Sequence, residues 1–291
     1  MVICNGFAQA LVLISQALRK KGVRRIALED PCQPDLRRIV SDAGLIPVSV
    51  PVDERGIRIE ILERLKVQAV LITPAHQFPT GSVLEPERRQ RLIDWSVRSS
   101  AFIIEDDYDA EYRYDRAPVG ALQGLAPERV IYAGSLSKIL APALRIGWII
   151  APAEMYAAIE DRKKYADLMS PILEQLTFAD FLREGELDRH LRRMRSVYRR
   201  RRDALIAVLA SYFPDWRLTG AAAGLHLVAN LPTRFDEQEV ARLSSARSVR
   251  IYPMRGYCFK APSEPALVFG YGSLSESQIG RGISQLAAAL S

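Results

Sequence analysis

Short apolar runs alternate with helical patterns along the first half of the chain. Runs rich in Ile, Val and Leu predict strands at 24–30, 45–53, 68–74, 101–107, 129–135 and 145–152. Between the earlier runs, apolar residues recur at helical spacing, which predicts helices at 8–22, 34–44 and 85–100. Pro34 and Pro86 fall in first turns, and Gly22 and Gly44 follow helix ends. The alternation predicts an α/β fold, with a mostly parallel central sheet and helices on both faces.

The pattern changes after Pro152. Residues 153–210 are mostly helical, and strands follow at 226–232, 249–253 and 266–272. A closing helix spans 275–290, with Ser275 as its expected N-cap. We therefore expect a large domain at 1–170, then connecting helices and a smaller C-terminal α+β domain at 171–291. No Gly/Ser linker separates the two parts, so the boundary should lie on a helix between 165 and 185.

Composition narrows the class of protein. Of the 291 residues, 48% are hydrophobic and 25% are charged, as in an ordinary globular protein. No apolar run reaches the roughly 18 residues of a membrane span, and no signal-peptide pattern opens the chain, so a cytoplasmic protein without a membrane partner is expected. The three cysteines and three histidines show no ligand spacing, so neither a disulfide framework nor a metal site is predicted.

The formal net charge is +6, and much of the excess lies at 188–205. A basic helix can bind nucleic acid. A solvated helix face is the preferred interpretation, because no aromatic or motif pattern accompanies the charges. A basic chain also suits an anionic cofactor or substrate, which is a third interpretation.

Polar segments follow three of the apolar runs directly. They are "TPAHQFPTG" at 73–81, "EDDYDAEYRYD" at 105–115 and "GSLSK" at 134–138. In open parallel sheets, binding sites form at the carboxyl ends of strands. Three polar strand ends carrying acids, a tyrosine, serines and a lysine therefore predict one shared cavity.

The chemistry of these segments points to one small molecule. Lys138 can form a Schiff base with an aldehyde if its amine is deprotonated. Asp106 can hold a protonated ring nitrogen, and the serines beside the lysine can bind a phosphate together with Arg145. A glycine loop that opens a helix, "NGFAQAL" from position 5, offers N–H groups to the same phosphate. Pyridoxal 5′-phosphate (PLP) carries all of these groups.

At these residues the chain resembles the fold-type I PLP enzymes, specifically the class I/II aminotransferase family. It is most similar to the aminotransferase-like domain of MocR-type (GntR family) bacterial regulators. The similarity is carried by "EDP" at 29–31, the 73–81 and 105–115 segments, "GSLSKILAPALRIGW" from 134, and the basic helix. It covers nearly the whole chain and implies a large domain with a mostly parallel sheet, a smaller C-terminal domain and a homodimer.

The resemblance also implies residue roles. Lys138 would carry the Schiff base, Asp106 would pair with the pyridine nitrogen, and Tyr108 would bind the phenolic oxygen. The phosphate would be held by Ser135, Ser137, Arg145 and the backbone of Gly6, Phe7 and Ala8, with His76 and Gln77 in the loop near the ring oxygen.

Three departures from the family pattern bear on activity. Gln33 stands where the family often has a tyrosine that stacks on the ring, and Val268 stands where an arginine binds the α-carboxylate. The chain also opens at the first glycine loop, although MocR-type proteins have an upstream winged-helix domain. We therefore expect a fragment or a shortened gene product, which would contact DNA only through the missing domain.

Three functions follow as hypotheses. The first is a PLP-dependent aminotransferase that acts on amino acids or amines through Lys138. The second is an effector-sensing PLP domain of a MocR-type regulator with little or no turnover. The third reads Ser135-x-x-Lys138 as a serine acyl-enzyme motif, which ranks last because the S-D-N and K-T-G partner motifs are absent.

Overall fold

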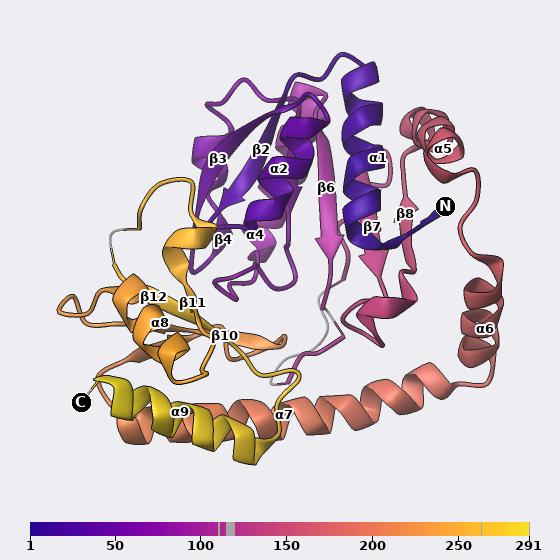
Figure 1. Ribbon diagram of the computed structural model, residues 1–291. Coiled ribbons are helices and arrows are strands. Elements are labelled where there is room, and N and C mark those ends of the chain that lie inside the picture. The colour runs from indigo at the N-terminus through magenta and orange to yellow at the C-terminus, as the bar shows by residue number, and fades with distance from the viewer. Residues whose placement is uncertain (110, 115–119, 263, 291) are drawn as a thin grey trace.

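The computed structural model describes residues 1–109, 111–114, 120–262 and 264–290 (Figure 1). Within these residues the strands form an eight-stranded and a four-stranded sheet, and the larger has the order β1-β8-β7-β6-β5-β2-β3-β4. Its strands are β1 (Val2–Cys4), β2 (Arg25–Asp30), β3 (Ile46–Asp53), β4 (Gly56–Ile57), β5 (Ala69–Ile72), β6 (Phe102–Asp107), β7 (Val130–Ser135) and β8 (Gly147–Ile150). The central five run parallel, while β1, β4 and β8 pair antiparallel with their neighbours, so the predicted mostly parallel sheet is confirmed.

Helices cover both faces of this sheet, as expected. They are α1 (Gly6–Lys20), α2 (Pro34–Asp42), α3 (Ile59–Leu62), α4 (Pro86–Ser99) and α5 (Ala153–Asp167). Neighbouring residues of β6 show how the two faces divide: Ile104 packs in the core beneath α1, and Ile103 packs in the opposite core with α4. This follows from the two-residue period of a strand, which sends successive side chains to opposite faces.

The smaller sheet is antiparallel, in the order β11-β12-β10-β9. Its strands are β9 (Arg217–Thr219), β10 (His226–Asn230), β11 (Tyr252–Pro253) and β12 (Ala266–Gly270), and α8 (Glu237–Ala246) and α9 (Glu276–Leu290) lie with them. Leu227 and Leu267 pack against Leu205 of α7 (Glu186–Tyr212) and Ile283 of α9 in a separate core.

The closing helix begins as predicted. The Ser275 hydroxyl accepts a hydrogen bond from the Gln278 amide at 3.3 Å, and the Gln278 side chain accepts one from the Ser275 amide at 2.8 Å. This reciprocal pair satisfies two N–H groups that a helix start otherwise leaves unpaired.

The connection between the sheets runs through α5, α6 (Ile172–Arg183) and α7, and α7 extends beneath the smaller sheet (Figure 1). The boundary between 1–170 and 171–291 stays a prediction. None of the described helices is both long and apolar enough to span a membrane.

The basic segment 188–205 lies on α7, and some of its arginines donate hydrogen bonds to carbonyls of neighbouring loops. Arg195 donates to the Glu111 carbonyl at 2.6 Å, and Arg202 donates to the Ala221 carbonyl at 2.9 Å. Because these guanidinium groups satisfy loop carbonyls, the helix is more than the solvated face expected from its charge pattern.

Candidate functional site

A cavity of about 480 Å³ lies where the two sheets meet. The strands β2, β5, β6 and β7 are parallel, so their carboxyl ends share the edge of the sheet that borders it. The larger sheet and its loops contribute Phe7, Ala8, Leu28, Glu29, Cys32, Gln33, Leu36, Leu71, Ile72, Thr73, Phe78, Asp106, Tyr108, Asp109, Ser135, Ser137, Lys138 and Arg145. The smaller sheet and its loops contribute Leu225, His226, Tyr252, Tyr257, Val268 and Gly270.

The start of α1 and Arg145 form one side of the cavity. β1 pairs with β8 so that Cys4 lies opposite Gly147, which brings the first turn of α1 beside Arg145. The Arg145 guanidinium donates to the Asn5 carbonyl at 2.5 Å. Gly6 has a φ of +78°, a backbone conformation that favours glycine, and it packs against the Arg145 guanidinium, which would lie 2.9 Å from a Cβ there. Helix N–H groups and a guanidinium together favour an anion.

The segment after β7 contributes three donors. Ser135 is buried at the strand end, and Ser137 and the exposed Lys138 follow it; all three line the cavity. Backbone bonds from Leu136 to Ile146 and from Leu140 to Leu136 hold the turn. Within the described residues, the hydroxyls and the Lys138 amine have no side-chain hydrogen bond, so all three remain available to a ligand.

Asp106 at the end of β6 is a buried carboxyl that faces the cavity, with a relative exposure of 8%. Burial, followed by the charges of Asp107, Asp109 and Glu29, raises its pKa well above the ordinary value. In the described part of the chain it has no hydrogen bond and no cationic partner. A positively charged ligand group at this position would relieve the repulsion.

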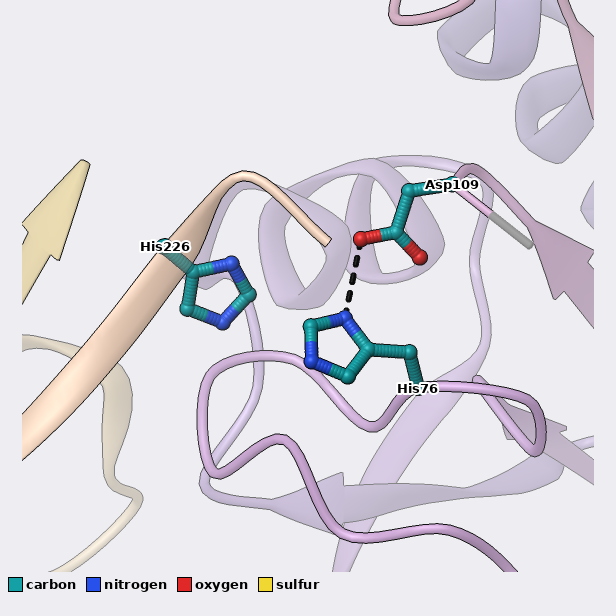
Figure 2. A group of neighbouring side chains, drawn as sticks. All are labelled: His76, Asp109 and His226. Carbon is teal, nitrogen blue, oxygen red and sulfur yellow. Dashed lines mark hydrogen bonds and ion pairs between the residues drawn. The ribbon is translucent and has the colours of Figure 1, made fainter. Parts of the chain in front are cut away.

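Tyr108 is held by His76 and Asp109. The Tyr108 hydroxyl donates to the His76 carbonyl at 3.0 Å and lies 3.1 Å from His76 Nδ1. His76 Nδ1 in turn lies 2.8 Å from a carboxylate oxygen of Asp109, and both side chains are almost fully buried (Figure 2). Burial and the charge of Asp109 raise the pKa of Tyr108, so the phenol stays protonated.

His226 of β10 lies beside this pair, with its ring centroid 5.0 Å from that of His76 (Figure 2). Burial and the neighbouring His76 lower its pKa to about 3, so it is neutral at physiological pH. Ligand atoms of His76, Asp109 and His226 lie within 4.8 Å of one another, but His76 and Asp109 already bind each other. The wide sequence separation of the histidines gave no sign of this group.

Glu29 and Gln77 organise the wall between β2 and β5. Glu29 accepts hydrogen bonds from the amide and hydroxyl of Thr73 at 3.0 and 2.7 Å, and burial raises its pKa to about 7. The Gln77 amide donates to the carbonyls of Pro31 at 2.8 Å and Phe78 at 2.7 Å.

Of the expected site residues, Gly6, His76 and Gln77 lie behind the cavity surface, and the other eight line it. In the 73–81 segment, Thr73 and Phe78 reach the cavity. Glu29 and Phe78 occur in the quoted motifs but were not selected, because an acid and an aromatic ring in such a loop carry no distinctive spacing. Positions 110 and 115 of the 105–115 segment lie outside the described residues.

The wall from the smaller sheet follows from alternation along β12. Leu267 and Phe269 pack into the core with α7 and α9. Val268 and Gly270, on the opposite face, line the cavity. This wall was missed in the sequence except at Val268, because an apolar strand face resembles any core face.

The chain was compared with known proteins. The family described as aminotransferase class I and II matches residues 1–283. An uncharacterised HTH-type transcriptional regulator of Bacillus subtilis, YdeL, is 35% identical over 266 residues, covering 91% of this chain and 58% of that protein. The probable rhizopine catabolism regulatory protein MocR of Rhizobium meliloti is 31% identical, over 99% of this chain and 59% of that protein. The chain thus spans about three fifths of these relatives.

Among solved structures, the α-aminoadipate aminotransferase LysN of Thermus thermophilus is similar, with a TM-score of 0.89 and 28% identity. The match covers 99% of this chain and 76% of that one, whose structure contains N-(5′-phosphopyridoxyl)-L-leucine. The family match and this relative imply PLP as the cofactor.

The residues fit that cofactor. Asp106 is a buried carboxyl with no cationic partner in the part of the chain that the structure describes, which suits a pyridinium nitrogen. The α1 start with Arg145 and the serines offers donors for a phosphate, and Lys138 offers an amine in the same cavity.

Proposed function

The chain belongs to the aminotransferase class I and II family, and we propose that it binds PLP covalently through Lys138 and acts on amino acids or amines. The observation that carries the proposal is Asp106, a buried carboxyl that shares one cavity with the amine of Lys138; neither group has a side-chain partner among the described residues. PLP bound here would supply an electron sink for negative charge at the substrate carbon next to nitrogen.

Residues of the larger sheet would each contact a different part of the cofactor or substrate. Asp106 would keep the ring nitrogen protonated by charge pairing. Tyr108, held by His76, would place its hydroxyl at the phenolic oxygen. The Lys138 amine, once released, would accept and return the proton at the substrate carbon.

The phosphate would lie at the start of α1. Ser135 and Ser137 would donate hydroxyls, and Arg145 would donate paired N–H groups. The backbone N–H groups of Phe7 and Ala8 in the first helical turn would add the partial positive charge of the helix end. Burial of Ser135 and the close packing of Gly6 on Arg145 support this arrangement.

Attachment is tested with the purified protein and PLP. An absorbance band of the bound cofactor should appear, and borohydride reduction followed by peptide mapping should label Lys138. A Lys138→Ala variant should lose both signals and keep its circular-dichroism spectrum. Label on another lysine, or no label at all, would contradict the proposal.

A second candidate function is effector sensing with little turnover, as in a transcription regulator. It is supported by the similarity to YdeL and MocR, and by Val268, which lies in a cavity wall whose described residues include no cation. Steady-state assays with 2-oxoglutarate and with pyruvate distinguish the two. We expect slow or no transamination across common amino acids, and rapid turnover with any of them would favour the enzyme.

We also propose a homodimer. Large apolar side chains are exposed along the end of α5 and on α6, including Tyr165, Leu168, Leu173 and Leu176, at 58–77% relative exposure. Exposed apolar patches of this kind mark protein contacts. Analytical ultracentrifugation should give twice the 32.6 kDa chain mass.

A further inference from the structure

Among the described residues, all charged side chains that line the cavity come from the larger sheet and its loops. The cations are Lys138 and Arg145, and the acids are Glu29, Asp106 and Asp109. On the smaller-sheet wall, the lining residues are Leu225, His226, Tyr252, Tyr257, Val268 and Gly270. His226 is neutral because burial lowers its pKa to about 3. This wall therefore carries no charge.

The proposed function engages both cations. Lys138 would hold the cofactor and Arg145 its phosphate, so the described lining residues leave no further cation for a carboxylate on the substrate. Apart from Asp106, the described charged residues left in the lining are the acids Glu29 and Asp109. A buried carboxylate without a cationic partner is strongly disfavoured, whereas a cationic amine is attracted to the same acids.

The remaining space is aromatic and aliphatic. Phe78 contacts two residues of the smaller-sheet wall edge-on, with its ring centroid 5.4 Å from that of Tyr257 and 4.9 Å from that of His226. Val268 adds a branched aliphatic surface that is 3% exposed. Burying apolar area of a ligand against this surface favours binding.

We infer that the site takes a primary amine that lacks a carboxylate and has an apolar carbon skeleton, rather than an α-amino acid. This inference rests on the proposed function, and it assigns the smaller-sheet wall the role of selecting against acids.

The test uses two ligands that differ only in the carboxylate, 2-phenylethylamine and L-phenylalanine. Each is titrated into the PLP-loaded protein, following the cofactor absorbance band and, separately, the heat of binding. We expect at least about tenfold tighter binding of the amine. Binding of phenylalanine as tightly as the amine, or of neither ligand, would overturn the inference.

A variant tests the reason for the preference. Gly270 lies at the cavity end of β12, and a Cβ there would meet nothing within 4 Å, so Gly270→Arg introduces a guanidinium with little strain. We expect Gly270→Arg or Val268→Arg to tighten phenylalanine binding at least about tenfold. Gly270→Gln, which lacks the charge, and Gly280→Arg on α9, outside the cavity, should leave it unchanged.

Failure of cofactor binding can be distinguished from failure of ligand selection. If no cofactor band forms before a ligand is added, the proposed function itself fails. If the band forms and Lys138 is labelled, but neither arginine variant improves phenylalanine binding, then the missing cation is not what selects the ligand and the inference fails alone.

Discussion

The two walls of the cavity are built by different means. On the larger-sheet wall, Asp106 and Ser135 lie at the ends of the neighbouring parallel strands β6 and β7, and Lys138 follows β7, so the sheet itself brings them together. On the smaller-sheet wall, Val268 and Gly270 are the outward positions of an antiparallel strand whose other face forms a core. The first wall fixes polar groups in space, and the second presents a surface whose chemistry a single substitution can change.

This difference separates cofactor binding from ligand choice. In and behind the larger-sheet wall, several polar groups hold one another in place through hydrogen bonds, such as Tyr108, His76 and Asp109. The lining residues of the smaller-sheet wall have few such hydrogen bonds to one another. Substitutions there should therefore alter ligand specificity and leave the fold intact. The predictions below test that contrast.

The largest effect is expected where the two walls touch. Gly224 has a φ of +75°, and a Cβ there would lie 2.2 Å from His76 and 2.5 Å from Asp109. Gly224→Ala should therefore destabilise the protein by about 3 kcal/mol, through steric overlap and backbone strain. Gly270→Ala, on the smaller-sheet wall, should change stability by less than about 0.5 kcal/mol. Urea unfolding measures the stability of both variants. Equal losses of stability in Gly224→Ala and Gly270→Ala would contradict this prediction.

The next largest effect is expected at Asp106 of the larger-sheet wall. Asp106→Asn removes the charge that would hold a protonated ring nitrogen. We expect at least about 100-fold slower amine-dependent change of the cofactor band, with PLP affinity reduced by less than about tenfold. Asp107→Asn is the matched control, because Asp107 already accepts a hydrogen bond from Tyr132 at 2.8 Å. An unchanged Asp106→Asn protein, or a larger loss in the control, would place the acid elsewhere.

The same contrast explains what the sequence predicts well. Strands at 24–30, 101–107 and 129–135 were confirmed, because continuous apolar runs with turn residues at their ends identify parallel strands. β1 and β4, with three and two residues, were missed because so short a segment has no measurable period. The strand expected at 249–253 is confined to Tyr252–Pro253.

Site prediction has a similar limit. Lys138, Asp106 and Arg145 lie in motifs, so sequence reasoning could bring them to one cavity, although their roles stay predictions. His76 and His226 lie together only because the smaller sheet folds onto the 73–81 loop, a contact that no local pattern encodes. The burial of Asp106 and Glu29, which sets their pKa values, likewise depends on tertiary packing.

Burial of Glu29 in the larger-sheet wall should lower the stability of the protein at neutral pH. Its pKa is raised from 4.5 to about 7 by burial, so the folded protein binds more protons than the unfolded chain between these values. Stability therefore falls as pH rises from 4.5 to 7, and the penalty is complete above 7. Glu29→Gln removes this titration, so its stability relative to the native protein should rise by about 2 kcal/mol from pH 5 to pH 8.

Urea unfolding at both pH values measures the Glu29 effect. Glu54→Gln, at an exposed position, is the control and should show no such change. A relative stability of Glu29→Gln that stays flat or falls with pH would mean that the buried acid is not penalised.

The smallest effect is expected at Arg145, which lies at the solvent-exposed margin of the larger-sheet wall. Its guanidinium is anchored on the Asn5 carbonyl and presents further N–H groups beside the first turn of α1. A lysine keeps the charge but cannot make paired hydrogen bonds to phosphate oxygens. Arg145→Lys should therefore weaken PLP binding by about tenfold, or about 1.4 kcal/mol, and leave unfolding by urea unchanged. Pyridoxal, which lacks the phosphate, provides the internal control, since its affinity should be the same in both proteins. Equal losses of affinity for PLP and pyridoxal would show that Arg145 does not bind the phosphate, because a residue that contacts only the phosphate cannot affect a ligand that lacks one.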